Sequence, residues 1–451
     1  MERYDIAIVG AGPAGEAATH YARSRGASVA VIDRELFGGS CPFWACMPSK
    51  SLLHAAAVHH AGGDYPWARA SDFRDYMINR EATDWPSDHG HVAALEGAGA
   101  TVIRGEASFA GAGRLRIGTD GGAAREIESD GVILAVGSVS RLPDLPGLDA
   151  IQPWTNRQGT ATRALPRSLL ILGGGPTGVE LAQVYARYGV PVTVVHPRHH
   201  INDRDHPRSS ELLADGLRRD GVTLRLGTRA TRITAAAGGD GAHVAELADG
   251  STAEGHELML AIGRDLPLER LNLGAIGVVP ENGRVAVDAR LKVTDGVWAA
   301  GDVAGPELHT HLAHYSGEMA VRQALGDDVA PAFEAIPRAT YTDPETAGVG
   351  LLLEQARERG IDAVELTADV GTSAKGYVTE SSGHVTIVVD RAERVLVGAF
   401  MAGPAVSEAI HECVLAIRAR VTLDVLADTL HAFPTVARVT GGLFVQADRE
   451  L

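Results

Sequence analysis

Two glycine-rich turns, each set between a short apolar strand and a helix, constrain the fold of this chain more than any other feature. The first lies in "YDIAIVGAGPAGEAATHYARSRGASVAVID", where Gly10, Gly12 and Gly15 follow a predicted strand and the next strand ends on Asp33. In this pattern one glycine permits a tight turn, one lets a pyrophosphate approach the backbone, and one lets helix and strand pack closely. The helix N-terminus then faces the phosphates, and Asp33 can accept a hydrogen bond from a ribose hydroxyl. With strand, helix and acid all in place, a dinucleotide site is favoured over a plain glycine turn.

The second turn lies in "SLLILGGGPTGVELAQVYARYGVPVTVVH", with Gly173, Gly175 and Gly178 again between strand and helix. Two complete patterns predict two dinucleotides, or the two ends of one electron path. Here the second strand ends on His196 instead of an acid, and Arg198 follows. An acid would repel a 2′-phosphate, whereas Arg and His would attract it, so we expect NADPH in preference to NADH. A solvated basic loop is the alternative reading.

Length and charge exclude several classes of protein. The chain has 451 residues, enough for two to four domains, and a formal net charge of −16 without a basic block. Nucleic-acid binding is therefore not expected as its main task. The N-terminus reads "MERYDIAIVG", without the apolar segment and cleavage site of a signal peptide, and no apolar run reaches about 18 residues. We expect a cytoplasmic protein that does not enter a membrane.

The segment "GGSCPFWACMPSK" carries Cys41 and Cys46. In a reducing compartment such a close pair is more often catalytic or metal-binding than structural, and so short a loop stabilises little as a cross-link. A four-ligand zinc site needs a second pair of ligands at the right spacing, so we expect no metal and favour a redox pair. Phe43 and Trp44 are expected to pack, and restricting access to the sulfurs is the alternative. Cys413, in an apolar helical pattern, is expected to be a buried thiol.

Three further apolar strands end in glycine. "GVILAVGS" ends at Gly137, "LMLAIGR" at Gly263, and "LKVTDGVWAAGDVAG" reaches Gly301 and Asp302. An acid at a strand end beside a dinucleotide site is well placed to bind a sugar-like hydroxyl, although an Asp that caps the following turn is a common alternative. From about residue 334 the pattern changes to alternating strands followed by helices, which indicates an α+β domain.

Taken together, these segments resemble the FAD-dependent pyridine nucleotide–disulfide oxidoreductases, the family of dihydrolipoamide dehydrogenase, glutathione reductase and mercuric reductase. The resemblance rests on the first glycine turn, "GGSCPFWACMPSK", "GGGPTGVELA", "AAGDVAG" and "IPRATYTDPETAGVG", in this order over nearly the whole chain. It implies an α/β fold with two doubly wound, Rossmann-like dinucleotide-binding domains and an α+β C-terminal dimerisation domain. The implied boundaries are 1–150 and 266–333 for an FAD-binding domain in two parts, 151–265 for the NAD(P)-binding domain, and 334–451 for the dimerisation domain of a homodimer.

The resemblance also implies roles for individual residues. Cys46 would be the thiolate beside the flavin, Cys41 the thiol that meets a small-molecule acceptor, and Lys50 a neighbour of the flavin that pairs with Glu180. Asp302 would bind the ribitol of FAD. The other expected contacts to FAD are Gly10, Gly12, Pro13, Ala14, Gly15, Asp33, Arg34, Gly39, Ser40, Gly137, Gly301, Leu312 and Ala313. The expected contacts to the nicotinamide dinucleotide are Gly173, Gly175, Gly178, His196, Arg198 and Gly263.

The implied reaction moves hydride from NADPH or NADH to FAD, and electrons from there to the cysteine disulfide and a small disulfide substrate. Thiol chemistry of this kind requires thiolates. We therefore expect the cysteine pKa to fall below the free value of about 8.5, through a helix N-terminus and the ammonium of Lys50.

The C-terminal segment "LHAFPTVARV" departs from the family pattern. Family members that reduce disulfides carry a His-Pro-Thr here, with a Glu five residues after the His, and that His moves protons across the dimer. Phe433 and Arg438 occupy these two positions, and Phe cannot move a proton. His431, on the same side of an extended segment, is a candidate substitute. The bond between Phe433 and Pro434 is expected to be cis, as in the family.

Two functions therefore stay open. One is a reductase of a small disulfide. The other is an FAD-dependent NAD(P)H dehydrogenase that uses a quinone, a metal ion or oxygen, or else a dithiol oxidase. His309, His311 and His314 follow Asp302 and are weaker candidates for a proton donor. A non-catalytic FAD-binding protein is disfavoured because both cysteines and their expected neighbours are intact.

Overall fold

The computed structural model of the protein describes residues 1–80, 85–118, 122–235 and 241–451. The chain divides into two compact units, which we describe separately. The first holds residues 1–51, 68–141 and 263–332, and the second holds residues 52–67, 142–262 and 333–451. The division that the sequence suggests, into an FAD-binding domain in two parts, an NAD(P)-binding domain and a dimerisation domain, stays a prediction.

An eight-stranded sheet with a parallel centre forms the framework of the first unit. Strands are parallel in the order β17-β6-β1-β2-β3, while β16 pairs antiparallel with β17, and β5 joins β6 to β4 in an antiparallel meander. Val, Ile and Ala fill β1 and β2, which are buried on both faces, as parallel strands between two layers must be. The strands are β1 (Glu2–Val9), β2 (Val29–Asp33), β3 (Thr101–Arg104), β4 (Glu106–Gly111), β5 (Arg114–Gly118), β6 (Arg125–Leu134), β16 (Lys292–Thr294) and β17 (Val297–Ala299).

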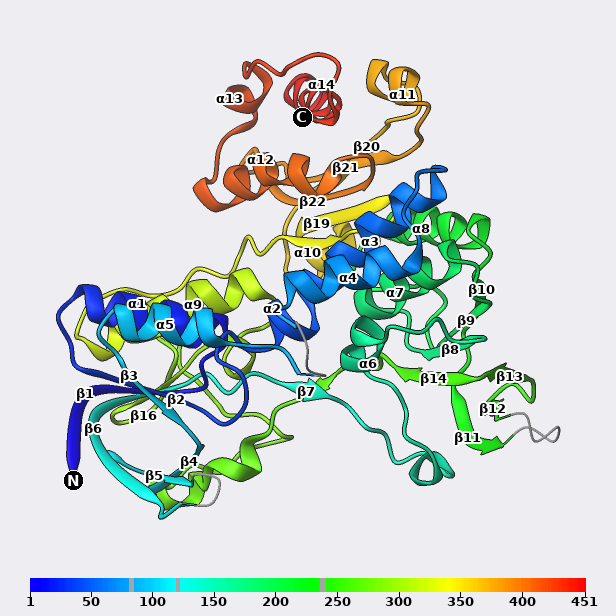
Figure 1. Cartoon of the computed structure of the whole chain (residues 1–451). Helices are drawn as coiled ribbons and strands as arrows, with labels where there is room; N and C mark the ends of the chain where they lie inside the picture. The colour runs from blue at the N-terminus through cyan, green and yellow to red at the C-terminus, as the bar shows by residue number, and fades with distance from the viewer. Residues whose placement is uncertain (81–84, 119–121, 236–240) are drawn as a thin grey trace. The chain divides into compact units, whose positions relative to one another are not determined.

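Helices α1 (Pro13–Ser24), α5 (His89–Gly97) and α9 (Thr310–Ala324) lie along one face of this sheet (Figure 1). The other face packs against β4, β5 and the 3-10 helices η2 and η3 in one apolar cluster. The remaining elements of this part are α2 (Ser40–Trp44), α3 (Cys46–His60), α4 (Trp67–Met77), β7 (Val139–Ser140), β15 (Arg264–Asp265), η2 (Leu268–Leu271), η3 (Leu273–Ile276) and η4 (Gly301–Val303). Helix α3 carries the chain from the first unit into the second.

Glycines bring the backbones of this layer into direct contact. A Cβ on Gly15 would lie 1.9 Å from the carbonyl oxygen of Gly10, and a Cβ on Gly317 would lie 2.2 Å from that of Ala14. Helix α1 therefore packs closely on the turn after β1, and α9 packs closely on α1. This contact holds the N-terminus of α1 at the carboxyl edge of the sheet, where doubly wound folds bind their ligands.

A second parallel sheet, in the order β10-β9-β8-β14, lies in the second unit. Its four strands follow the same chain order as β3-β2-β1-β6 of the first unit. Helix α7 connects β8 to β9, and α8 connects β9 to β10. The elements are η1 (Leu148–Ala150), α6 (Asn156–Ala161), β8 (Leu169–Leu172), α7 (Pro176–Arg187), β9 (Val192–His196), α8 (Pro207–Arg219), β10 (Thr223–Leu226) and β14 (Glu257–Leu260), with an antiparallel sheet of β11 (Ala230–Ala235), β12 (His243–Leu247) and β13 (Thr252–Gly255).

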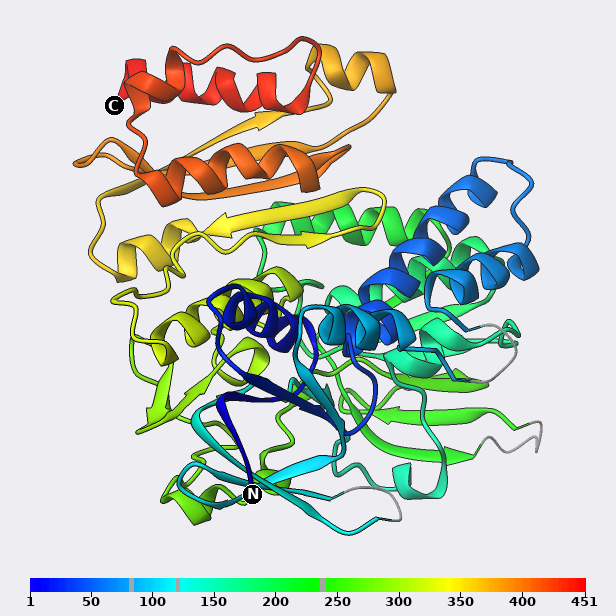
Figure 2. The same cartoon turned by 60° about the vertical axis from the view of Figure 1, so that its left-hand side comes forward.

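The C-terminal part of the second unit is a five-stranded antiparallel sheet in the order β18-β19-β22-β21-β20. Helices α12 and α14 pack on this sheet (Figure 2). In β21, Val385, Ile387 and Val389 join the cluster with these helices, whereas Val388 faces the cluster of α10. The elements are β18 (Arg338–Thr340), β19 (Glu345–Gly350), α10 (Leu353–Glu358), β20 (Ala363–Asp369), α11 (Ala374–Thr379), β21 (His384–Asp390), β22 (Val395–Gly403), α12 (Val406–Ala419), α13 (Leu423–Ala427) and α14 (Val436–Glu450).

The predicted fold class is confirmed: two doubly wound parallel sheets and an α+β C-terminal part. The Phe433–Pro434 bond is cis, as predicted, and so is Asp343–Pro344. Cys413 is a free, buried thiol in the core around α12, also as predicted. In the part of the chain that the structure describes, none of the helices combines the length and the apolar character needed to cross a bilayer.

The close contact between α9 and α1 allows a prediction about the stability of the fold. Replacing Gly317 by Ala should lower the free energy of unfolding by about 1–3 kcal/mol, because the new methyl overlaps a main-chain carbonyl and no flexible side chain can move aside. The matched control is Gly97→Ala at the end of α5, where a Cβ would meet nothing within 4 Å. Urea unfolding followed by circular dichroism measures both, and equal free energies of unfolding for the two variants would contradict the prediction.

Candidate active site

The two paired cysteines lie on consecutive helices of the first unit. Cys41 is the second residue of α2 and Cys46 is the first residue of α3, with Ala45 as the non-helical residue between them. Both are half-buried free thiols, and their side chains hydrogen-bond to each other. The break at Ala45 therefore brings the two sulfurs together, as interconversion of dithiol and disulfide requires.

The electrostatics of Cys41 differ from the expectation. The pKa of the Cys41 thiol is raised above its ordinary value, first by the hydrogen bond to Cys46 and then by burial. A proton held against a second sulfur in a half-buried site is harder to remove than one that faces water. The expected fall of the cysteine pKa is therefore wrong for Cys41 in the dithiol form.

Cys46 has a different environment. It begins a 15-residue helix, whose N-terminus favours negative charge, and its Sγ lies 3.3 Å from Oγ1 of Thr310 at the start of α9. Lys50 follows one helical turn later and so shares a face of α3 with Cys46. Thr310 was not among the predicted site residues, because a lone threonine between two histidines belongs to no recognisable pattern.

Phe43 and Trp44, between the cysteines, are buried. The ring of Phe43 meets the ring of His91 edge-on with centroids 5.4 Å apart, and Trp44 meets Trp85 in the same way at 5.2 Å. The packing role predicted for these two side chains is confirmed.

The first glycine turn has the geometry of an anion site. Gly10 has φ +104°, and a Cβ there would lie 2.2 Å from the carbonyl oxygen of Ala135. Gly12 is the N-cap of α1 and supplies no side-chain cap, so the first-turn N–H groups beyond Pro13 are available to a ligand. Ala14 and Gly15, which the sequence analysis also selected, belong to this first turn.

Asp33 at the end of β2 holds the glycine turn in place. Its Oδ2 accepts a hydrogen bond from the N–H of Ala11 at 2.8 Å, and its Oδ1 accepts one from Glu35 at 2.8 Å. Burial raises the pKa of this carboxyl. Each oxygen keeps acceptor capacity for a further donor such as a ribose hydroxyl.

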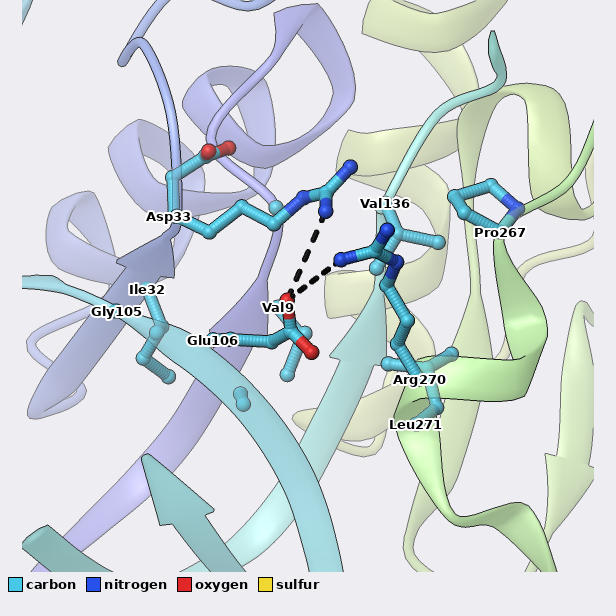
Figure 3. Close-up of a pocket in the computed structure, with 12 residues that line it drawn as sticks. Val9, Ile32, Asp33, Gly105, Glu106, Val136, Pro267, Arg270 and Leu271 are labelled. Atoms are coloured by element: carbon cyan, nitrogen blue, oxygen red, sulfur yellow. Dashed lines mark hydrogen bonds and ion pairs between the residues drawn. The ribbon is translucent and has the colours of Figure 1, made fainter. Parts of the chain in front are cut away.

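A small cavity lies where β1, β2 and β6 end, in the first unit. Apolar side chains line it, among them Val9, Ile32, Val136 and Leu271. Figure 3 shows that Arg270 points to the carboxylate of Glu106. The distances to Oε2 of Glu106 are 2.9 Å from Nη1 of Arg270 and 3.6 Å from Nη1 of Arg34. The cavity therefore combines an apolar lining with a charged cluster.

Asp302 belongs to a polar cluster with Ser138 and Arg264. Ser138 donates a hydrogen bond to its carboxylate, and Nε of Arg264 donates to Oγ of Ser138 at 2.6 Å and lies 4.0 Å from Oδ2 of Asp302. Ser138 and Arg264 were missed in the sequence, yet each directly follows a selected glycine, Gly137 or Gly263. The usable signal was the polar residue after each glycine.

Close contacts at two glycines connect the remaining predicted residues of this unit to the first glycine turn and to helix α1. Gly39 has φ +71°, and a Cβ there would lie 2.6 Å from Cα of Gly12, so the turn that precedes Ser40 and Cys41 rests on the first glycine turn. Gly301 lies against both long helices, since a Cβ there would be 3.2 Å from Cβ of Ala14 and 3.5 Å from Cβ of Ala313. Leu312, beside Ala313, is buried in α9.

The second glycine turn repeats the geometry of the first, within the second unit. Gly173 has φ +117°, Gly175 is an N-cap without a side-chain cap, and a Cβ on Gly178 would lie 2.1 Å from the carbonyl oxygen of Gly173. The N–H of Gly174 donates to Nδ1 of His196 at 3.1 Å, in the position where Ala11 donates to Asp33. The histidine therefore takes the place of the acid in this turn.

The surroundings of His196 are partly basic. Burial lowers its pKa, and its Nε2 lies 3.9 Å from Oδ1 of Asp203, beyond hydrogen-bond range. Arg198 is exposed and lies 3.4 Å from the same carboxylate. The loop after His196 is basic and exposed at Arg198, and Asp203 balances part of its charge.

Glu180 is buried on α7 and accepts a hydrogen bond from the N–H of Tyr341 at 3.1 Å. Lys50 belongs to the first unit and Glu180 to the second. The predicted pairing of these two residues therefore stays a prediction.

The C-terminal segment exposes Phe433, which is 75% accessible, and buries the ring of His431. Nε2 of His431 lies 2.7 Å from Oε1 of Glu412, and the ring fills the space that a side chain on Gly441 would need. This setting favours a structural role over the predicted catalytic one, which stays a prediction. Among the other candidates, His309 is the N-cap of α9 and pairs with Glu307 at 2.8 Å, next to Thr310.

Comparison with known proteins identifies the family of this chain. Residues 4–321 match the family model described as pyridine nucleotide-disulphide oxidoreductase, and residues 336–441 match its dimerisation domain. A dihydrolipoyl dehydrogenase from Halobacterium salinarum is 33% identical over 97% of this chain and 94% of its own. A mercuric reductase from Streptomyces lividans is 30% identical over 96% of this chain and 94% of its own.

Solved structures agree as well. The HOCl-induced flavoprotein disulfide reductase RclA from Escherichia coli, in a Cu(II) complex, superposes with a TM-score of 0.88 at 25% identity, over 99% of this chain and 100% of that chain. LpdA from Mycobacterium tuberculosis superposes with a TM-score of 0.87 at 27% identity, over 100% of both chains. With two glycine turns, a cysteine pair and family matches along most of its length, this chain belongs to the pyridine nucleotide–disulfide oxidoreductases, flavoprotein enzymes that act on sulfur groups.

Proposed function

We propose that this protein passes electrons from NADPH, or from NADH, through FAD to the Cys41–Cys46 pair and on to a small acceptor, in the first place a small disulfide. The observation that carries the proposal is the hydrogen-bonded thiol pair at the start of α3. It belongs to the same unit as the first glycine turn, and Gly39 joins the two.

The residues of the first unit fit the parts of FAD. The uncapped N-terminus of α1, with Gly10 and Gly12, suits the pyrophosphate, and the carboxylate of Asp33 suits the ribose. The apolar cavity beside Arg34 suits the adenine, and Asp302 with Ser138 suits the hydroxyls of the ribitol. When bound, FAD supplies a two-electron carrier between a nicotinamide and a disulfide.

The thiols then carry out an exchange with a substrate disulfide. Two electrons and one proton convert the disulfide into a Cys41 thiol and a Cys46 thiolate at the N-terminus of α3. Cys41 attacks the substrate, so that a Cys41–substrate bond forms, the substrate S–S bond breaks, and the proton of Cys41 goes to the first leaving thiolate. Cys46 attacks Cys41, which restores the disulfide and releases the second thiolate, and that thiolate takes a proton from water. Each NAD(P)H oxidised thus yields two substrate thiols.

Of the steps of this exchange, the proton transfer receives the least assistance from the site. The raised pKa of Cys41 makes its proton harder to remove, and the position at which relatives in the family place a histidine holds Phe433. General acid–base help is worth roughly 10²–10⁴-fold where it exists. This observation favours substrates whose thiolate leaves easily. It also supports the second candidate function, a dehydrogenase with a quinone, metal ion or oxygen as acceptor, or a dithiol oxidase.

A homodimer is the proposed assembly. The match of residues 336–441 to the family's dimerisation domain supports it. Exposed apolar side chains of this region, namely Leu415, Val425, Leu430 and Phe433, give a partner subunit apolar area to cover.

The hydrogen bonding of His196 supports NADPH over NADH. Because Nδ1 accepts the N–H of Gly174, the proton of the neutral ring must be on Nε2. The lowered pKa keeps the ring neutral at neutral pH. His196 therefore carries a donor, on its buried Nε2 atom, where Asp33 carries acceptors, and a 2′-phosphate accepts hydrogen bonds. Arg198 adds a positive charge beside it.

Replacing Gly39 by Ala should weaken FAD binding by at least about tenfold, which is about 1.4 kcal/mol. The new Cβ overlaps Cα of Gly12 and forces the two turns apart. Gly62→Ala is the control, since Gly62 also has a positive φ, +84°, but a Cβ there meets nothing within 4 Å. Flavin absorbance per protein after gel filtration measures retention. Equal flavin content in the two variants would speak against the predicted site.

The proposed function is tested with Cys41→Ser. Turnover of a small aromatic disulfide with NADPH should fall by roughly 10³-fold or more, since the attacking sulfur is gone. Cys413→Ala, which alters a cysteine buried in the other unit, should keep it. Anaerobic reduction of the wild type should also produce a long-wavelength absorption band from Cys46 beside the flavin.

The same variants separate the two candidate functions. If Cys41→Ser still reduces a quinone while disulfide turnover disappears, electrons can leave without the pair. If neither activity responds to the substitution, or if the flavin bleaches fully without the long-wavelength band, the redox role of the cysteines is wrong.

Replacing Arg198 by Ala should raise the KM for NADPH by roughly tenfold and leave the KM for NADH nearly unchanged, because only NADPH carries the 2′-phosphate. Arg218→Ala serves as the control, since Arg218 is an exposed arginine of α8 paired with Asp215. Steady-state kinetics with both nucleotides measures the ratio. An equal change for NADPH and NADH would contradict the assignment.

A further inference from the structure

The first turn of α5 contacts the chain on both sides of Cys41. The ring of His91 meets Phe43, two residues after Cys41, with centroids 5.4 Å apart. The same ring covers Gly38, three residues before Cys41, where a Cβ would lie 2.7–2.8 Å from three ring atoms. One side chain therefore touches both flanks of the attacking thiol.

A second side chain of this turn, that of Asp88, contacts the same segment, residues 37–43. Asp88, the N-cap of α5, accepts a hydrogen bond from the N–H of Phe37 at 2.9 Å and lies 2.6 Å from Nη2 of Arg104 at the end of β3. The segment from residue 37 to residue 43 is thus held at its start by Asp88 and further along by His91.

His91 itself is held by Glu16, in the first turn of α1. Nδ1 of His91 lies 2.7 Å from Oε1 of Glu16, and both side chains are partly exposed. The titratable and charged groups around His91 are Glu16 from α1, Asp88 from its own helix, and Arg104 from β3, which pairs with Asp88. The hydrogen bond to Glu16 raises the pKa of His91 above its ordinary value of 6.5, which favours the charged pair.

We propose that His91 is a positioning residue for Cys41: its ion pair with Glu16 holds the turn at Gly38 and the ring of Phe43, and loss of the charge on His91 loosens the segment that carries the thiol. The inference rests on the proposed role of Cys41 as the attacking sulfur. In this proposal the mobility of Cys41 depends on pH, and the pH range is set by the titration of His91 and not by that of Cys41.

The direction of the pH effect follows from the ion pair. Below the pKa of His91 the imidazolium and the carboxylate of Glu16 attract each other, and Cys41 is held. Above that pKa the ring is neutral, the attraction weakens, and Cys41 moves more freely. Since the pKa is raised, the change takes place above pH 6.5.

The experiment uses the full-length, FAD-bound, reduced protein and measures the rate at which iodoacetamide alkylates Cys41, by mass spectrometry of its peptide. The variants are His91→Gln and Glu16→Gln, and the control is His89→Gln, an exposed histidine of the same turn. Dividing each rate by the wild-type rate at the same pH cancels the part that comes from thiolate formation. Circular dichroism and flavin content verify folding, and Glu16→Gln leaves the packed ring of His91 in place.

Both test variants should alkylate roughly threefold faster than the wild type near pH 6, the size expected for a half-exposed ion pair, and the ratio should approach one near pH 9. The control should give a ratio of one throughout. A ratio of one for Glu16→Gln at every pH overturns the proposal, and so does a raised ratio that does not change with pH, because packing alone would produce it.

The test also separates this inference from the proposed function. A wild type without the long-wavelength band on anaerobic reduction refutes the proposed function whatever the alkylation ratio. A wild type with the band, together with a flat ratio, refutes only the role of His91.

Discussion

The contact of main chain with main chain around the first glycine turn is the constraint on which the rest of this structure depends. Gly10 lies against Ala135, Gly15 against Gly10, Gly39 against Gly12, and Gly317 against Ala14, each closer than any side chain permits. These contacts place the anion-binding N-terminus of α1, the turn before Cys41 and the start of α9 around one centre. Cys46 then meets Thr310 because α9 is packed on α1. The proposed cofactor site and the proposed redox pair thus belong to one arrangement of close main-chain contacts.

The redox pair combines a favourable and an unfavourable setting. Cys46 has the helix N-terminus and a hydroxyl beside it, whereas Cys41 holds its proton more tightly than a free thiol. In the family pattern a histidine would assist that proton, and here Phe433 stands at its position while His431 is buried against Glu412. The chemistry most compatible with this arrangement involves acceptors that need little proton assistance. The contacts of His91 with Glu16, Phe43 and the turn at Gly38 are the basis of the positioning role proposed for His91, which supplies no proton.

The two glycine turns share a backbone geometry and differ in the chemistry of one residue. Asp33 and His196 end equivalent strands, and each accepts an N–H from the middle of its glycine turn. The acid keeps acceptor capacity for hydroxyl groups, whereas the neutral histidine carries its N–H on a buried Nε2. The two turns therefore share a scaffold and differ in the residue that ends the second strand, on which the proposed preference for NADPH rests.

The sequence by itself determined the features that depend on local pattern: the glycine turns between strand and helix, the cysteine pair, the fold class, and the replacement of the family's histidine by Phe433. It selected Asp302 but not Ser138 and Arg264, and the cysteine pair but not Thr310, Glu16 or His91. These residues act through partners far away in the chain, and nothing in a local pattern records which distant segments meet. The raised pKa of Cys41 and the burial of His431 were likewise decided by tertiary structure, because both follow from neighbours and solvent exclusion that exist only once the helices have packed.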